Sequence, residues 1–468
     1  MRNHNTPLGE HADFGDARLN ARLTLLDERL RNKLEYTLPQ ALPEPYQMKA
    51  AYRFFSNEKV NSEEIIKAQR QRFDLRSKIE PGEETLLLIQ DTTDIDLTTN
   101  RVADAGVLNY DKRRGCKMHT SLAVQASKGV PLCVFKQDHI VRSDDSLGKT
   151  AKRKYDAVEN KESYRWIAHQ RAMVDYFQDQ PEREIISVCD KEADFHDLLA
   201  SPRSSNVHYL IASKYNRKDD NSGNGIWDQV AKQPSLGTTK VRITQPQKRT
   251  TKQITMELRC YQARISLRHP KAYQKKLGSV ELSVIEARKV SPETGKAIVW
   301  RLLSSKPVHT FEQARIMLEY YTHRWLIERF HYVLKSGAHI EELQLDRMER
   351  ILNAIALYSG LACDHMRMNY FARREPDTTI DQAGISQQKH QALYVYANQV
   401  LKTDLKYRPD KPPTVYEYIR LIGRIGGFRP SKRQPLPGLK TLWRGMLEFN
   451  RVLEMFKALQ TQRPETYG

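Results

Sequence analysis

The alternation of apolar and polar positions is most regular between residues 311 and 337. On a helix at about 100° per residue, Tyr321, Arg324, Glu328 and Lys335 fall within one arc of roughly 60°. The opposite side is apolar and carries Ile316, Ile327, Phe330 and Leu334. We therefore predict one amphipathic helix that buries one face and presents an aromatic ring, a carboxylate and two cations on the other.

A charged helix face of this kind is most often only solvated. A carboxylate between two cations also suits a metal ion and a phosphate bound side by side. The pattern by itself leaves both interpretations open.

Two short apolar runs upstream each end in an aspartate. The run from Leu86 to Ile89 precedes Asp91, and the run at 185–189 precedes Asp190. Continuous apolar runs of this length are typical of buried strands. An aspartate at the carboxyl edge of such a strand projects toward a site that the sheet holds rigid.

Asp91, Asp190 and Glu328 would together give three carboxylates on separate elements. Hard divalent cations prefer such oxygen ligands, and two Mg²⁺ ions held this way promote phosphodiester chemistry. Neighbouring acids keep the choice of ligands open on this evidence alone, because further carboxylates lie nearby at Asp94, Asp96, Glu192, Asp194 and Asp197.

The rest of the chain divides into a helical start, a mixed middle and a helical end. Helical spacing marks residues 1–70, and a polar segment near residue 375 precedes another helical region. We predict an N-terminal helical domain at 1–70, which could either hold DNA backbone or cap the next domain, an α/β domain at 71–372 with a mostly β insertion at about 205–305, and a C-terminal helical domain at 373–468. The last helix carries one apolar stripe, which is either its packing face or a dimer seam: Leu442, Met446, Phe449, Leu453 and Phe456.

The charge of the chain points to a polyanionic partner. Lysine and arginine number 76 against 57 aspartates and glutamates, a formal net charge of +19. Nucleic acid is the first candidate for such an excess. An anionic membrane is the competing partner, but the chain has no apolar run of the roughly 18 residues that a membrane span needs. We therefore expect a nucleic acid as the partner, and no membrane.

The five cysteines are widely spaced and form no CxxC pair, so neither a zinc knuckle nor a disulfide framework is indicated. This usage fits a reducing compartment, and the N-terminal residues lack the apolar stretch of a signal peptide. We expect a cytoplasmic protein.

Several segments together carry a resemblance to a known family. The segment YTHRWLIERFHYVLKSG contains the spacing Tyr-x2-Arg-x3-Glu-x6-Lys. IQDTT around Asp91 and VCDKEADFH around Asp190 are similar to the catalytic segments of the same family, and so are GDARLNAR, AYRFFSN and RIGGF toward the two ends. The chain thus resembles the bacterial insertion-sequence-four family of DDE transposases over nearly its whole length.

The resemblance implies roles for individual residues. Asp91, Asp190 and Glu328 would be the DDE triad that holds two Mg²⁺ ions, for which Mn²⁺ would substitute. Tyr321, Arg324 and Lys335 would contact phosphates at the transposon end. Trp300 would stack on a base flipped from the duplex, although a lone tryptophan in a strand is ordinarily a core residue. Arg22 and Arg53 would take part in recognising the end sequence.

The resemblance also implies a fold and a reaction. The fold would be an α/β RNase H-like catalytic core with a mostly β insertion, flanked by an N-terminal helical domain that binds double-stranded DNA and a C-terminal helical dimerisation domain. The reaction would be cut-and-paste transposition: hydrolysis at the transposon end, a hairpin intermediate, and transfer of the 3′-OH into target DNA. A homodimer would bind two ends in a synaptic complex, in the cytoplasm of a bacterium near its nucleoid.

Other classes remain to be weighed. A catalytically inactive DNA-binding inhibitor or relic would share the fold, and a metal-dependent nuclease without strand transfer would share the site. A hydrolase of small phosphoesters is disfavoured by the net charge of +19 and by the lack of a glycine-rich phosphate loop.

Overall fold

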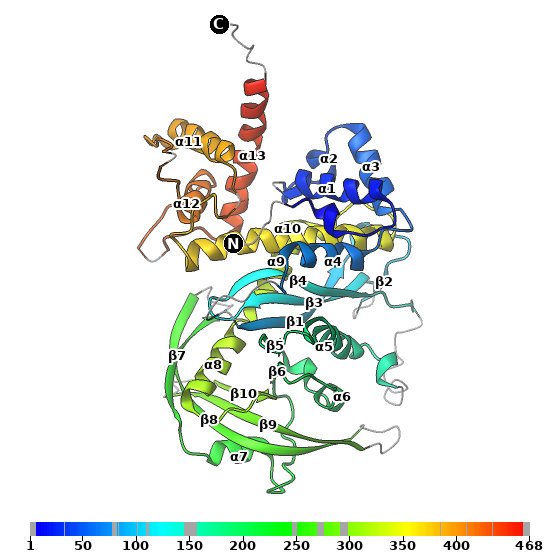
Figure 1. Ribbon diagram of the computed structural model, residues 1–468, viewed down its shortest axis with the longest axis vertical. Coiled ribbons are helices and arrows are strands. Elements are labelled where there is room, and N and C mark those ends of the chain that lie inside the picture. The colour runs from blue at the N-terminus through cyan, green and yellow to red at the C-terminus, as the bar shows by residue number, and fades with distance from the viewer. Residues whose placement is uncertain are drawn as a thin grey trace.

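One mixed β-sheet runs through the middle of this computed structural model (Figure 1). The structure describes residues 6–461 except 32, 77–81, 83, 101, 109–111, 145–156, 246–249, 269–275, 291–297, 384, 409 and 433. Within the described residues the sheet has ten strands in the order β2-β3-β1-β5-β6-β10-β9-β8-β7, and β4 pairs with β3.

One half of the sheet is the RNase H-like core that we predicted. It comprises β1 (Thr85–Asp96), β2 (Gly106–Val107), β3 (Arg114–Gln125), β4 (Val130–Ile140), β5 (Glu184–Cys189) and β6 (Val207–Ala212). β1, β3 and β4 pair antiparallel, whereas β1, β5 and β6 run parallel. Three antiparallel strands joined to a parallel group in this order are the RNase H-like arrangement.

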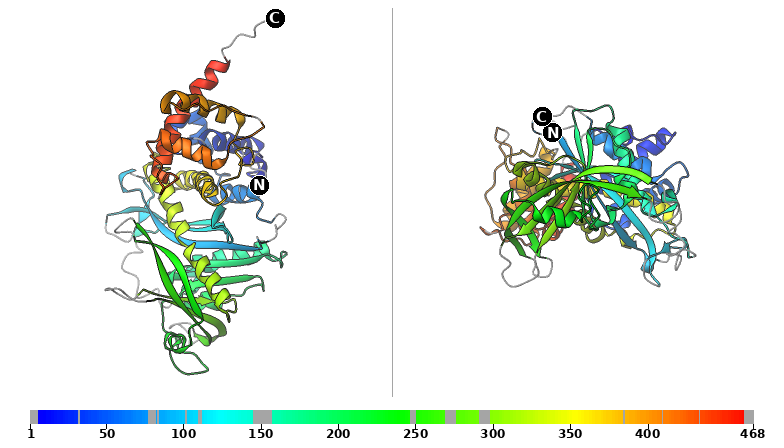
Figure 2. Two further views of the ribbon diagram at one scale, coloured as in Figure 1. Left: turned by 90° about the vertical axis from the view of Figure 1, so that its left-hand side faces the viewer. Right: turned by 90° about the horizontal axis from the view of Figure 1, so that it is seen from below.

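The other half of the sheet is antiparallel and strongly curved (Figure 2). It comprises β7 (Gly237–Gln245), β8 (Thr250–Arg268), β9 (Lys276–Lys289) and β10 (Val299–Ser304). We expected the inserted strands to start near residue 205, but β6 pairs in parallel with β5 and continues the core. The apolar run of β6 does not reveal its partner, so only the pairing separates it from the antiparallel strands that follow.

Helices cover both faces of the core. On one face lie α5 (Tyr164–Phe177) and α6 (His196–Leu199), and α7 (Ile226–Lys232) packs on β8 and β9. On the other face lie α8 (Phe311–Thr322), α9 (Trp325–Ser336) and α10 (Met348–Arg374). Short 3-10 helices connect these elements: η1 (Leu8–His11), η2 (Thr98–Asn100), η5 (Val158–Asn160), η6 (Lys191–Ala193) and η7 (Ile340–Glu342).

The helix predicted over residues 311–337 is in fact two helices. α8 begins at a capping box in which Thr310 and Gln313 bond to each other's backbone, and it ends at Thr322. Across the junction, the amide of Arg324 bonds to the Tyr321 carbonyl and that of Ile327 to Arg324, which are tighter i→i−3 bonds. Hydrophobic spacing alone carries no signal for this break, because His323 and Arg324 keep helical dihedral signs.

The N-terminal helices dock on the long helix α10 (Figure 1). They are α1 (Ala17–Arg31), α2 (Leu38–Ala41), α3 (Pro45–Phe55) and α4 (Ser62–Phe73). The buried Gln69 amide donates to the Ala356 and Leu357 carbonyls at 3.1 and 3.2 Å. Gly360 makes this possible, because a Cβ there would lie 2.4 Å from the Gln69 side chain.

The C-terminal helices form their own apolar cluster. They are α11 (Gln387–Leu401), α12 (Val415–Ile425) and α13 (Leu439–Thr461). The α13 stripe is a packing face, since four of its members are buried against these helices: Leu442, Met446, Phe449 and Leu453. No helix in the described part of the chain is both long and apolar enough to cross a membrane.

Candidate active site

Asp91 and Asp190 lie side by side just beyond the last pair of the parallel β1–β5 ladder. Asp190 directly follows β5, as expected, whereas Asp91 lies inside β1, which continues to Asp96 because it stays paired with β3. The β1–β5 ladder ends with Ile89 opposite Val188, and each aspartate follows two residues later. Side chains alternate along a strand, so both aspartates share the face of Ile89 and Val188. That face packs against α9 and α10. Both carboxylates therefore lie together on this face, just beyond the end of the β1–β5 ladder.

Glu328 reaches the same place from the first turn of α9, which packs on β1. Arg324 connects it to the sheet: its guanidinium donates to Glu328 and lies 4.0 Å from the Asp91 carboxylate. These three side chains are between one fifth and one third exposed, at 21% for Asp91, 22% for Arg324 and 32% for Glu328.

The electrostatics of this group are those of crowded carboxylates. The pKa of Asp91 is raised to about 7, chiefly by burial and also by the charges of Asp190 and Glu328, while the amide of Thr92 and the cation of Arg324 act to lower it. Burial also raises the pKa of Asp190, with Glu192 adding to the effect. A nearby positive charge favours the ionised form of each acid.

The donor set fits a hard divalent cation. Among the described residues no three histidine, cysteine or acidic side chains stand as a ready-made metal cluster, and Arg324 instead holds the Glu328 carboxylate. The chemistry of the donors nevertheless suits Mg²⁺ or Mn²⁺, because all three are carboxylates.

The basic and aromatic residues of the same helix pair surround this group. Lys335, two turns after Glu328, donates to the main-chain carbonyl of Asp94 and lies 3.3 Å from Glu341. Tyr321, at the end of α8, meets Trp300 of β10 edge to face, with ring centroids 6.0 Å apart. Burial raises the pKa of Tyr321, whose hydroxyl interacts with Arg324.

Two of the predicted residues lie elsewhere. Arg22 on α1 is partly buried and Arg53 on α3 is exposed, and Figure 1 shows both helices on the far side of α10 from the sheet. The structure therefore gathers Asp91, Asp190, Glu328 and their helix neighbours, and leaves these two arginines on a separate surface.

Sequence reasoning missed the polar residues behind Asp91. Arg165 at the start of α5 donates to Thr92 at 2.9 Å and to Glu192 at 2.8 Å. Thr92 also bonds to the buried His119. No sequence spacing could have predicted these contacts, because β1, β3 and α5 are distant in the chain and come together only in the folded protein.

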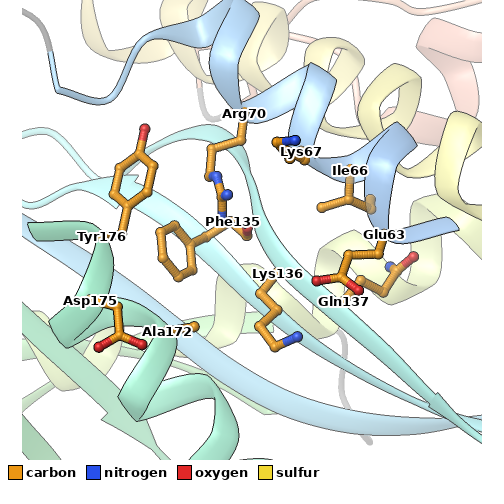
Figure 3. A pocket seen from close by; sticks show the side chains of 10 residues that line it. All are labelled: Glu63, Ile66, Lys67, Arg70, Phe135, Lys136, Gln137, Ala172, Asp175 and Tyr176. Carbon is orange, nitrogen blue, oxygen red and sulfur yellow. Dashed lines mark hydrogen bonds between the residues drawn. The ribbon is translucent and has the colours of Figure 1, made fainter. Parts of the chain in front are cut away.

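A hollow of about 350 Å³ lies apart from the carboxylates, between α4, β4 and α5 (Figure 3). Its cations are already engaged by the protein. Lys67 bonds to Glu64, Lys136 to Asp138 and Arg70 to the Phe135 carbonyl. Its walls also carry Glu63 and Asp175, so the hollow offers no concentrated charge for an anionic ligand.

Comparison with known proteins gives the family context of this geometry. A family model described as "Transposase DNA-binding" matches residues 6–60, and one described as "Transposase DDE domain" matches residues 167–362. The second match contains Asp190 and Glu328, and Asp91 lies before its start.

A solved structure, the cryo-EM structure of a piggyBac transposase synaptic complex with hairpin DNA, is similar at 8% identity and a TM-score of 0.32. That match covers 83% of this chain and 56% of the other, and at this level it carries no argument here. The two family matches show that the chain contains a transposase DNA-binding domain followed by a transposase DDE domain, and they support a DNA transposase of the DDE type.

Proposed function

We propose that this chain is a cut-and-paste transposase of the insertion-sequence-four type, which cleaves the ends of its element through a hairpin intermediate and joins them to target DNA. The observation that carries the proposal is the meeting of Asp91, Asp190 and Glu328 on one face of the sheet. The net charge of +19 suits the DNA partner.

In this proposal the three carboxylates hold the metal ions. A pair of Mg²⁺ ions, or Mn²⁺ in their place, supplies activation of the attacking water or 3′-OH and stabilises the leaving oxygen. Asp91 contributes from within β1, Asp190 from the residue after β5, and Glu328 from the first turn of α9. Arg324 would exchange its ion pair with Glu328 for a DNA phosphate when metal and DNA bind.

The neighbouring residues hold the DNA end. Lys335 and Tyr321, with Arg324, line the same side of the α8–α9 pair and would contact its phosphates. Trp300 lies against Tyr321 and would stack on the flipped base. Arg22 and Arg53 would read the end sequence from the N-terminal helices, at a distance from the cut.

Two copies of the chain would act together. A synaptic homodimer would join two transposon ends, with the C-terminal helices as the expected contact between protomers. The setting would be the cytoplasm of a bacterium, at its nucleoid.

A cleavage assay tests the proposal. Purified protein is incubated with labelled DNA that carries the element's own terminal repeats, with and without Mg²⁺, and the products are resolved on a denaturing gel. We expect Mg²⁺-dependent nicks followed by hairpinned ends. Glu328→Ala should abolish both and leave end binding intact.

The matched control is Glu319→Ala, because Glu319 lies on the preceding helix, is exposed and pairs with Arg315. This variant should cleave like the unmodified protein. Nicks without hairpins or joined products would favour the nuclease instead. Specific binding without cleavage would favour the inactive inhibitor or relic.

A further inference from the structure

A set of buried polar side chains lies behind Asp91, on the face of the sheet that packs against α5. Gln90, His119 and Ser187 are at most 1% exposed. Burying polar groups is costly unless they are hydrogen-bonded. Each of these three is bonded to another side chain, so the set is a connected network and not a collection of stray polar atoms.

The hydrogen bonds of this network run in one direction. The Gln90 side-chain oxygen can only accept, so the proton of His119 lies on Nε2, which donates to it at 3.1 Å. His119 Nδ1 then accepts from the Thr92 hydroxyl at 2.8 Å, and that hydroxyl accepts from Arg165 Nε at 2.9 Å. At the other end, the Gln90 amide donates to Ser187 at 2.7 Å.

The network reaches the segment of the second aspartate as well. Arg165 Nη2 donates to Glu192 at 2.8 Å, and Nη1 donates to the Glu162 carbonyl at 2.6 Å. The main-chain amide of Glu192 donates to the Asp190 carboxylate at 2.8 Å. Arg165 therefore joins the residue next to Asp91 to the residue that bonds Asp190.

The side-chain link through Arg165 lies where the backbone hydrogen bonds between β1 and β5 have ended. The β1–β5 ladder ends at Ile89 opposite Val188, while the β1–β3 ladder continues to Asp96. Asp91 and Asp190 stand just beyond that end, where no backbone bond joins their strands. Beyond that end, Thr92 and Arg165 supply a side-chain link that continues through Glu192 to Asp190, whereas the Gln90–Ser187 bond joins the two strands inside the ladder.

We propose that Thr92 and Arg165 are positioning residues that fix the spacing of Asp91 and Asp190 for a divalent cation. The inference rests on the metal-binding part of the proposed function. Substituting a side chain that orients a metal ligand commonly lowers metal affinity or activity by about ten- to a hundredfold.

Charge and positioning make opposite predictions for Arg165. Removing the positive charge of Arg165 would relieve its Coulomb repulsion of the metal ion, and this effect alone should tighten metal binding. Loss of positioning should weaken it. Variants that keep the charge therefore isolate positioning: Thr92→Val removes only the hydroxyl, and Arg165→Lys keeps the charge but loses the planar fork that serves three acceptors.

The experiment measures Mn²⁺ binding to the full-length protein without DNA, by isothermal titration calorimetry, together with the thermal midpoint. We expect Thr92→Val and Arg165→Lys to weaken Mn²⁺ binding about tenfold in a protein that still unfolds in one cooperative transition, with a lower midpoint because buried donors and acceptors lose a partner. Thr92→Ser keeps the hydroxyl and should restore the affinity of the unmodified protein. The control Arg171→Ala lies on the same helix, bonds to the Tyr164 hydroxyl and should change nothing.

The possible outcomes separate the two claims. Unchanged Mn²⁺ affinity in Thr92→Val and Arg165→Lys would overturn the positioning role and leave the proposed function standing. A weakening that Thr92→Ser does not restore would also overturn it, because the hydroxyl would then be irrelevant. Absence of Mn²⁺ binding by the unmodified protein would overturn the metal site itself, and the inference with it.

Discussion

At the scale of single residues, the carboxylates are held close before any metal compensates their charge. Asp91 illustrates this, since its pKa is raised from 3.8 to about 7 by burial and by Asp190 and Glu328. The folded metal-free protein thus keeps a proton on Asp91 at pH values where the unfolded chain has lost it. Stability consequently falls as the pH rises from about 4 to about 7.

Asp91→Asn should remove the loss of stability that accompanies ionisation of Asp91 as the pH rises. Each pKa unit is worth about 1.4 kcal/mol, so the metal-free variant should be more stable than the unmodified protein by roughly 1–4 kcal/mol at pH 8 and by much less at pH 5. Urea unfolding in the presence of a chelator measures both values. An equal difference at the two pH values would show that Asp91 ionises normally in the folded protein.

Trp300 has two possible roles that kinetics separate. It is half-buried against Tyr321, and stacking of one base on an aromatic ring is worth about 1–3 kcal/mol. Under the proposed function, Trp300→Ala should slow hairpin formation by about tenfold or more while first-strand nicking changes little. Time courses of the two products on one gel give both rates.

Trp300→Phe is the control, because it keeps an aromatic ring and should lose far less hairpin formation. If nicking and hairpinning slow equally in Trp300→Ala, the residue acts through the folding of β10 and not through a flipped base.

At the scale of elements, the site depends on how α9 is tied to β1. Lys335 donates to the Asp94 carbonyl and pairs with Glu341, so the last turn of the helix is anchored to the strand that carries Asp91. The break between α8 and α9 places Arg324 at the start of the second helix, within reach of both Asp91 and Glu328.

Lys335→Ala tests whether this lysine also neutralises a DNA phosphate. Each phosphate contact contributes about one unit to the slope of log K against log salt concentration. The variant should therefore bind end DNA with a slope smaller by about one, measured by fluorescence anisotropy at several salt concentrations. Lys232→Ala, on α7 at the lower end of the molecule in Figure 1 and away from α9, should keep the full slope.

A full slope in Lys335→Ala would mean that the lysine stays bonded to Asp94 and Glu341 in the complex. It would then be an anchor of α9 and not a DNA contact.

The sequence predicts some of these elements because their signals are local. Apolar runs predict β1 and β5 and the aspartate that follows each run, although β1 continues past Asp91. The break at His323 and the parallel partner of β6 were missed, since the first leaves the helical pattern intact and the second depends on long-range pairing. The Arg165 network could not be predicted either, because the segments that form it are distant in the sequence and meet only in the folded protein.

At the scale of the whole molecule, α10 connects the parts. It packs on α4, α9 and α12, so the N-terminal helices, the core and the C-terminal helices all rest on one 27-residue helix. α13 extends from the C-terminal cluster, away from the sheet (Figure 1). Its stripe of buried residues faces inward, but Met455 and Leu459 near its end are 60% and 57% exposed.

The proposed homodimer makes this end of α13 testable. If it contacts the partner protomer, the double variant Met455→Glu and Leu459→Glu should reduce complexes containing two DNA ends by about tenfold or more, since each charge would be buried at the interface. Binding to one end should persist. Native gels with two DNA lengths distinguish the complexes.

Val395→Glu and Val400→Glu on α11 provide a control on another exposed apolar pair of the same cluster. Equal loss of paired complexes in both double variants would point to general damage of the C-terminal helices. No loss in the α13 variant would place the dimer contact elsewhere.

The central claim is that three distant segments form one metal site, and metal-directed backbone cleavage tests it most directly. The protein is loaded with Fe²⁺ in place of Mg²⁺, treated with ascorbate and peroxide, and the fragments are mapped by mass spectrometry. We predict cuts near Asp91, Asp190 and Glu328 together, all suppressed by excess Mg²⁺ and all lost in Asp190→Asn. Cuts confined to one segment, or unaffected by Mg²⁺ and by Asp190→Asn, would contradict the account.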